Sequence, residues 1–458
     1  MRGLAKAPAD RFPSTREFAE ALVAPPVETE TRSSIAVLPF VNLSGDAEDE
    51  YFGDGMAEEI ITALTRIQGL HVASRTSAFA FKDRHLDIRA IGELLNVGAV
   101  LEGSVRRSGN TLRVTAQLIN TADGYHLWAG RFDRERKDIF AIHDDIAANI
   151  ARALRMVLRD DERHAIARAP TSDPEAYDFY LRGRQFFHQR RKKSVIFARQ
   201  MFKRAIQRDP EYARAYAGVA DACAFLAHYY EDEYAAANLD EADEASRKAL
   251  ELDPQLAEAH AARGFLLTLR QRPDEAEAEF RQAIELDPNQ FEARYFHARA
   301  CFQQGDLTRA LELFGEAARV RDDHEALYFV AQTLTALNRP ADAEEAYRKA
   351  LPAIERYLEL NPDDGRAITM AAVCCSRLGE RARGLEWAHQ ATVVDPEDAN
   401  VAYNVACLMA LEGERDRAIG LLERAFRVGF ARRDWIEHDP DLESLRSDPR
   451  FQAMVGAR

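Results

Sequence analysis

The second half of the chain repeats one arrangement of small, bulky and polar positions. A bulky residue follows an alanine by four positions, and a second alanine follows three positions later. Five such triplets are Ala198, Phe202, Ala205; Ala276, Phe280, Ala283; Ala310, Phe314, Ala317; Ala343, Tyr347, Ala350; and Ala418, Leu422, Ala425. These spacings place the three side chains on one helical face, where the alanines let a neighbouring helix approach closely. Two copies are offset by thirty-four residues, which predicts a helix–turn–helix solenoid whose units bury their apolar faces only against one another.

Turn residues punctuate the same region. A proline that ends the second helix of a unit recurs in Asp173-Pro174, Asp209-Pro210, Asp253-Pro254, Asp287-Pro288 and Asp395-Pro396, with Asn361-Pro362 as a variant. Between helices stand Gly305, Asn338, Gly379 and Gly413, which tolerate a left-handed turn. The pattern resembles the tetratricopeptide repeat (TPR), and it predicts about seven units over residues 174–430.

Three units and the tail depart from the regular spacing, the first unit by two residues. The second unit carries about ten extra residues around His228–Leu239, and the fifth extends its second helix by PAIERYLELNP. We expect both insertions to disturb the pitch of the superhelix. Residues 431–458 form the predicted C-terminal capping segment, in which Trp435, Leu442, Leu445 and Phe451 would cover the last helix pair.

Residues 33–160 mix strands and helices, which predicts an α/β domain ahead of the all-α solenoid. The expected strands are Ser34–Val41, Leu70–Ala73, Ala99–Arg106, Thr111–Asn120 and Tyr125–Phe132, and the expected helices are Met56–Gln68, Ile88–Leu95 and Ile139–Leu158. Ile91, Leu94 and Leu95 are predicted to point inward. The stretches IAVLPFVNLSGDAEDEYFGDGMAEEIITALTRI and VLEGSVRRSGNTLRVTAQLINTADGYHLWAGRFDR resemble the TolB-like N-terminal domain. That resemblance implies a non-catalytic module of bacterial signalling proteins, among them adenylate cyclases, winged-helix transcription regulators and kinases.

An acidic loop is expected at residues 42–55. It contains Gly53-Asp54-Gly55, but neither a GxGxxG pattern nor a Walker lysine follows. Glu58 and Glu59 open the next helix, where carboxylates favour the positive helix end and would repel a phosphate. The loop is therefore predicted to be solvated, with charges that cap the helix.

The start of the chain, LAKAPADRFPSTREFAEAL, resembles the end of the C-lobe of bacterial serine/threonine protein kinases, with Arg11 as the arginine of the Pro-x-x-Arg-Phe/Tyr-Pro pattern. Residues 1–22 would then be a kinase remnant, residues 23–32 a linker, and residues 161–173 a second linker. The glycine-rich loop, His-Arg-Asp and Asp-Phe-Gly motifs of a kinase do not occur in this sequence. The alternative is a capped helix that arises by chance.

Composition narrows the possible partners. A net charge of -15 argues against general nucleic-acid binding. The basic run at residues 182–193 is expected to be an exposed turn with two core phenylalanines, Phe186 and Phe187, rather than an RNA site. The five cysteines lack metal or disulfide spacing and are expected to be buried thiols. No secretory signal and no membrane span is expected, and the predicted location is cytoplasmic.

The first helix of each unit should line the concave face, where peptides or helices dock. The predicted protein-binding residues are Tyr295, Arg299, Gln303, Tyr328, Gln332, Thr369, Arg377, Asn400 and Tyr403, although each of them also suits packing between units. The lysine/asparagine clamp of TPR co-chaperones is not matched. No catalytic, cofactor or metal residues can be nominated.

The sequence therefore predicts a non-catalytic interaction and regulatory module of a bacterial signalling protein, whose groove binds a peptide or partner protein. An upstream kinase domain is a possible partner within the parent protein. The alternatives are the C-terminal part of a serine/threonine kinase with kinase activity, of an adenylate cyclase or of a winged-helix transcription regulator, and a stand-alone scaffold.

Overall fold

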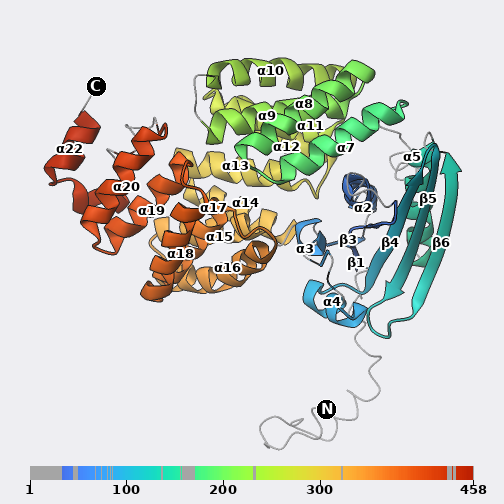
Figure 1. Cartoon of the computed structure of the whole chain (residues 1–458), viewed down its shortest axis with the longest axis horizontal. Coiled ribbons are helices and arrows are strands. Elements are labelled where there is room, and N and C mark those ends of the chain that lie inside the picture. The colour runs from blue at the N-terminus through green and yellow to red at the C-terminus, as the bar shows by residue number, and fades with distance from the viewer. Residues whose placement is uncertain are drawn as a thin grey trace, which may run out of the picture.

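The computed structural model describes residues 34–44, 50–65, 67, 69–73, 75–79, 81–82, 84, 86–135, 138–154, 156, 171–230, 234–320, 323–430, 436 and 440–456. The kinase-like start, the linker after it, most of the second linker and Trp435 lie outside these residues. Figure 1 shows a sheet domain at one end of the molecule and a coiled array of helices that leads away from it.

The N-terminal domain is built on one mixed sheet. Its strands are β1 (Ser34–Val37), β2 (Val41–Asn42), β3 (His71–Val72), β4 (Ala99–Ser108), β5 (Thr111–Asn120) and β6 (His126–Glu135). The order is β3-β1-β4-β5-β6, with β2 also paired to β4. β1 runs parallel to β3 and β4, whereas β4, β5 and β6 form an antiparallel meander. The predicted hairpins at residues 109 and 124 are present, and Gly109 and Gly124 both adopt positive φ.

Helices cover one face of this sheet. They are α2 (Glu50–Thr65) and α5 (Ile139–Ala153), with the shorter α3 (Arg75–Phe79) and α4 (Ile88–Leu95) near the β1–β3 side. Along β5, Leu112, Val114, Ala116 and Leu118 are buried, and the intervening Arg113 is exposed. This alternation gives the domain one packed face and one polar face.

Three details of the domain differ from the sequence expectations. The first strand ends at Val37 and resumes only as β2, and α5 ends at Ala153 rather than Leu158. The third difference is at Leu94, which is 66% exposed and not turned inward, although Ile91 is buried as predicted.

Between Pro174 and Arg427 the described residues form seven helix hairpins. They are α7 (Pro174–His188) with α8 (Lys192–Arg208), α9 (Ala213–Tyr229) with α10 (Ala235–Leu252), α11 (Ala257–Leu269) with α12 (Pro273–Leu286), α13 (Phe291–Gln304) with α14 (Leu307–Val320), α15 (His324–Ala336) with α16 (Pro340–Leu360), α17 (Gly365–Arg377) with α18 (Arg381–Val394), and α19 (Ala399–Leu411) with α20 (Arg415–Arg427).

The alanine and aromatic triplets lie inside this array. Phe202, Phe280 and Phe314 are fully buried together with their flanking alanines. Small residues on the first helices make room for these rings, as at Gly264, where an added Cβ would lie 2.7 Å from the Phe280 ring. The helices end before the Asp-Pro pairs, because Asp209, Asp253 and Asp287 already have extended backbone at the C-cap.

The apolar core is divided within α15. One cluster of buried residues runs from the sheet domain through the repeats to Ala326, and a second begins at Tyr328 and continues to Phe451. The second cluster includes Leu442 and Leu445 of η5 (Pro440–Leu445) and Phe451 of α22 (Pro449–Gly456), which pack against α19 and α20. These residues close the end of the array, as a terminal cap must.

Candidate interaction face of the repeat array

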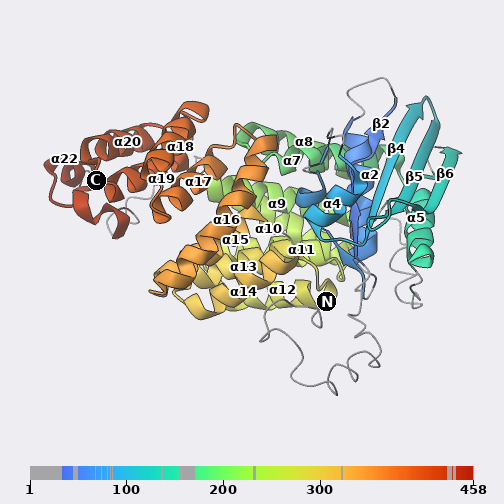
Figure 2. The same cartoon turned by 90° about the horizontal axis from the view of Figure 1, so that it is seen from below.

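The first helices of the hairpins form the inner wall of the coil, and α2 of the sheet domain lies against this wall (Figures 1 and 2). Gly55 of α2 packs against Leu181 of α7, and Arg182 lies 4.6 Å above the ring of Tyr51. On the other side of the domain, Arg84 forms an ion pair with Glu359 of α16 at 2.6 Å. The sheet domain therefore contacts the first and the fifth hairpin.

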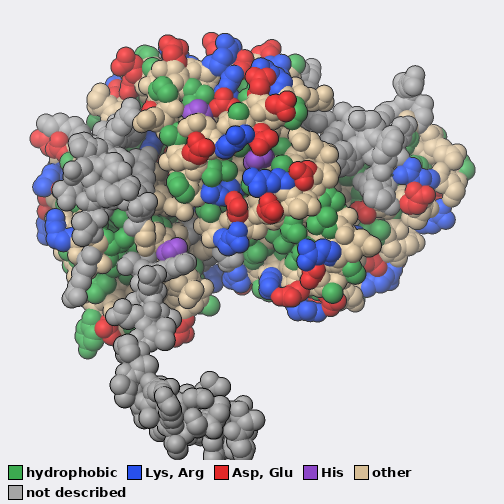
Figure 3. Space-filling model, turned by 180° about the vertical axis from the view of Figure 1, so that it is seen from behind, with side chains coloured by type: hydrophobic (Ala, Val, Ile, Leu, Met, Phe, Trp, Pro, Cys, Tyr) green, Lys and Arg blue, Asp and Glu red, His purple; other side chains and the backbone are tan. Residues whose placement is uncertain are grey.

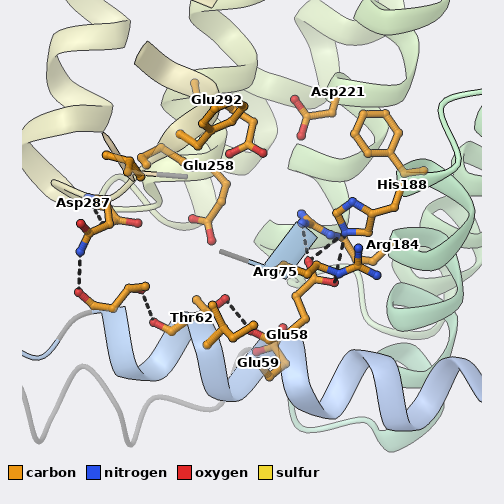
Figure 4. Close-up of a pocket in the computed structure, with 18 of the residues that line it drawn as sticks. Glu58, Glu59, Thr62, Arg75, Arg184, His188, Asp221, Glu258, Asp287 and Glu292 are labelled. Atoms are coloured by element: carbon orange, nitrogen blue, oxygen red, sulfur yellow. Dashed lines mark hydrogen bonds and ion pairs between the residues drawn. The ribbon is translucent and has the colours of Figure 1, made fainter. Parts of the chain in front are cut away.

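Glu58 is the centre of the contact between α2 and α7 (Figure 4). Arg184 Nη2 donates to Glu58 Oε1 at 2.5 Å, His188 Nε2 lies 3.2 Å from both carboxylate oxygens, and Arg75 Nε lies 3.3 Å from Oε2. Burial alone would raise the pKa of Glu58, but Arg184, His188 and Arg75 hold it well below its usual value. Burial, together with Arg75, lowers the pKa of His188 to about 3. The imidazole is therefore neutral, and its N–H donates to the carboxylate.

A second buried ion pair joins α2 to the next hairpin. Arg214 Nη1 of α9 donates to Glu59 Oε2 at 2.9 Å, and each side chain is only 13% exposed. At the end of α2, the backbone oxygen of Thr65 accepts from Asn289 Nδ2 at 3.0 Å. Through these contacts α2 spans the inner wall from α7 to the start of α13.

A cavity of about 150 Å³ remains between α2 and the wall. Asp221, Glu258 and Glu292 extend toward it from α9, α11 and α13 (Figure 4). Burial, with Glu292 and Glu258 nearby, raises the pKa of Asp221 to about 7. Among the described residues, no group of three or more His, Cys, Asp or Glu is placed to hold a metal ion.

Three of the predicted groove residues, Tyr295, Arg299 and Asn400, come together around the end of α9. Arg299 Nη1 donates to the hydroxyl of Tyr229 at 2.6 Å, and Asn400 Nδ2 donates to the backbone oxygen of Tyr229 at 2.8 Å. The guanidinium of Arg366 lies 4.1 Å above the Tyr229 ring. Tyr295 is buried nearby, and its hydroxyl donates to Glu325 at 2.5 Å. This part of the inner wall is thus occupied by the chain itself.

The other predicted groove residues lie apart. Tyr328 is buried, and its hydroxyl accepts from the half-buried Gln332. The buried Thr369 donates to the Gly365 oxygen at 2.8 Å, while Tyr403 stacks on Phe430 at 4.5 Å. Of the predicted set, Gln303 and Arg377 are exposed.

Two sequence interpretations need correction. Residues 50–55 are helical, and Asp54 is buried against Lys82 at 2.9 Å, so this segment is not a solvated loop. Glu58 and Glu59 do not cap a helix but are ion-paired across the domain interface. The basic run likewise is not simply an exposed turn, since Arg184 and His188 face α2 with 23% and 22% exposure. Sequence reasoning missed this contact, although the adjacent acidic residues Glu58 and Glu59 and the basic first repeat were a signal that could have indicated it.

The cysteines agree with the expectation, since all five are buried. Among the described helices, none combines the length and apolar character that a bilayer-spanning segment needs. On the face shown in Figure 3, acidic and basic side chains are interspersed over the array rather than gathered by sign.

Comparisons with known proteins cover parts of the chain. Residues 31–149 match the family described as "HilA/YgeH-like transcriptional regulator, second domain", and residues 267–321 and 295–355 match the tetratricopeptide repeat. The array is thus a TPR array, a class of structure that suggests protein–protein interaction. The TolB-like and kinase resemblances are not shown by these matches.

A curated relative, "Putative adenylate cyclase 3" of Rhizobium meliloti (strain 1021), is 44% identical over 212 residues. That match covers 46% of this chain and 36% of the relative, so the chain spans about a third of the relative's length.

Solved structures that match part of the chain include YrrB, titled a TPR protein with an unusual peptide-binding site. It is 24% identical, has a TM-score of 0.29, and the match covers 41% of this chain and 93% of YrrB. Another is PilW, titled a type IV pilus biogenesis factor, with 19% identity, a TM-score of 0.36, and coverage of 48% of this chain and 94% of PilW.

Proposed function

We propose that this chain is a non-catalytic interaction and regulatory module of a bacterial signalling protein, and that its repeat array binds a partner protein. The observation that carries the proposal is the array of seven consecutive hairpins, in which Gln303 and Arg377 at the ends of the first helices α13 and α17 remain exposed. Such arrays suit recognition of peptides and helices, and aromatic and arginine side chains are frequent anchors of protein interfaces.

Site-specific photocrosslinking in the native host tests this proposal. A photoreactive amino acid at Gln303 or Arg377, the exposed members of the predicted groove, should capture a discrete partner. The control positions are Arg348 and Lys349, which are exposed on α16 and form ion pairs with Glu344 and Glu345 of the same helix. Equal capture from both sets, or none from the groove, contradicts a groove-specific partner.

For the parent protein, the similarity to "Putative adenylate cyclase 3" favours a nucleotide cyclase as the signalling enzyme over the kinase expected from residues 1–22. The support is the 44% identity to a protein named as an adenylate cyclase. The match of residues 31–149 supports the transcription-regulator alternative. Translation of the genomic DNA upstream of Met1 separates the three classes, because cyclase, kinase and winged-helix domains have different motifs.

A further inference from the structure

Tyr229 is held by three hairpins that are distant from it in sequence. Its ring lies under Arg366 of α17, its hydroxyl accepts from Arg299 of α13, and its backbone oxygen accepts from Asn400 of α19. Repeats of a solenoid ordinarily contact only their neighbours. The end of α9 nevertheless places a tyrosine in the inner wall of the fourth, sixth and seventh hairpins.

Each of the three contacts depends on a different feature of Tyr229. A guanidinium over the ring favours an aromatic side chain, the Arg299 N–H distinguishes tyrosine from phenylalanine, and the Asn400 amide fixes the main chain. We call Arg299, Arg366 and Asn400 the tyrosine seat. None of them belongs to the predicted helix-packing triplets.

Tyr229 is bound to the seat by polar and cation–π contacts, not by a shared apolar core. Its apolar neighbours are Phe225, Leu226 and Val195, a small cluster separate from the two main clusters of the array. It is also the last residue of α9. A competing segment can replace polar contacts at the end of a helix at a lower free-energy cost than it can replace contacts within a continuous apolar core.

We propose that the tyrosine seat is the recognition site of the array for a tyrosine-bearing segment of a partner protein, and that Tyr229 occupies it as an internal competitor. The partner's tyrosine takes the place of Tyr229 under Arg366, with its hydroxyl on Arg299. The proposal rests on the proposed function and specifies where and what the array binds.

The test uses the full chain and a labelled peptide that copies residues 224–235, AFLAHYYEDEYA. In one variant, Tyr229–Tyr234 is replaced by Gly-Ser-Gly-Ser-Gly-Ser, which keeps the length and removes the internal competitor. Fluorescence anisotropy should show at least about tenfold tighter binding by this variant than by the natural chain. A peptide with phenylalanine at the position of Tyr229 should bind about tenfold more weakly, because it loses a hydrogen bond to a charged donor.

Arg299→Ala in the same background should abolish the preference for tyrosine over phenylalanine. Circular dichroism establishes that each variant is folded, and Tyr229→Ala replaces the Gly-Ser variant if that one does not fold. Any of three results overturns the tyrosine seat. They are equal binding by the variant and the natural chain, equal binding of the tyrosine and phenylalanine peptides, and no binding by a folded variant. If crosslinking is groove-specific but the peptide test fails, the proposed interaction function stands and only the tyrosine seat is rejected. If the peptide binds but no crosslinking occurs, the proposal of a groove-bound partner in the host is rejected.

Discussion

At the residue scale, the contact between the sheet domain and the array depends on a few buried charges. Glu59 and Arg214 are each 13% exposed, so removal of either leaves an uncompensated charge in a poorly solvated place. Pairs on the outer helices differ, as Glu345 and Lys349 are 64% and 68% exposed. Solvent-exposed ion pairs such as Glu345–Lys349 contribute little to the free energy of unfolding.

We therefore expect Glu59→Ala to lower the free energy of unfolding by about 3 kcal/mol, the scale for breaking a buried pair. The charge exchange of Glu59→Arg with Arg214→Glu should recover part of that loss, while Glu345→Ala should change it by less than about 0.5 kcal/mol. Urea denaturation followed by circular dichroism measures all of these variants. Additive losses in the exchanged variant would show that the two charges do not interact.

His188 predicts a pH dependence. Its pKa in the folded chain is about 3, below the ordinary value of 6.5, so the unfolded chain binds the proton more strongly. The contribution of His188 is therefore complete above pH 6.5 and declines as the pH falls, by up to about 1.4 kcal/mol per pH unit. His188→Gln should flatten the stability profile between pH 6.5 and 4.5 relative to the natural chain, and leave its slope above pH 7 unchanged. Parallel profiles across the whole range would show that the pKa of His188 is the same in the folded and unfolded chains.

At the element scale, α2 shows which features can be predicted from the sequence and which cannot. The strands of the meander and the helix Ile88–Leu95 were predictable from alternation and turn residues. The helical start of α2 was not, because Gly53 and Gly55 resemble turn residues. In the structure they allow close packing: a Cβ at Gly53 would lie 2.2 Å from the Phe40 oxygen, and one at Gly55 would lie 2.8 Å from two Leu181 methyl carbons.

Gly55→Ala is accordingly expected to destabilise the chain by about 1 kcal/mol, because the cost of overpacking against Leu181 exceeds the gain in helix propensity. Gly315 is the matched control, since it lies inside α14 with no neighbouring atom within 4 Å of an added Cβ. Gly315→Ala should stabilise by about 0.5–1 kcal/mol. Thermal unfolding of both variants tests the contrast, and stabilisation by both would show that Leu181 moves aside freely.

At the scale of the whole molecule, periodicity predicts hairpins but not how tightly they coil. The inner-wall positions Tyr295, Arg299 and Asn400 could be nominated from the repeat alone. The contacts of Arg299 and Asn400 with Tyr229 could not, because they depend on the pitch accumulated over several hairpins. Tyr229 thereby makes distant hairpins depend on one another.

This dependence predicts a change in hydrogen exchange. Tyr229→Ala should increase amide exchange in α13 by about tenfold, the loss expected for one hydrogen bond to a charged group, and should also increase exchange in α17, which loses the aromatic ring under Arg366, while the interior of α12 changes little. The control is Tyr234→Ala, since Tyr234 is 61% exposed. Mass spectrometry of peptides from each helix provides the measurement. Unchanged exchange in α13 and α17 would mean that each hairpin is held by its neighbours alone.

The division of the apolar core within α15 has a consequence for the history of such chains. Residues before Ala326 share their packing with the sheet domain, whereas those from Tyr328 onward complete a core of their own. Recombination near this point would transplant most of the distal core in one piece, provided that the incoming segment retains Phe329, which packs against both clusters, and the residues that receive Tyr229.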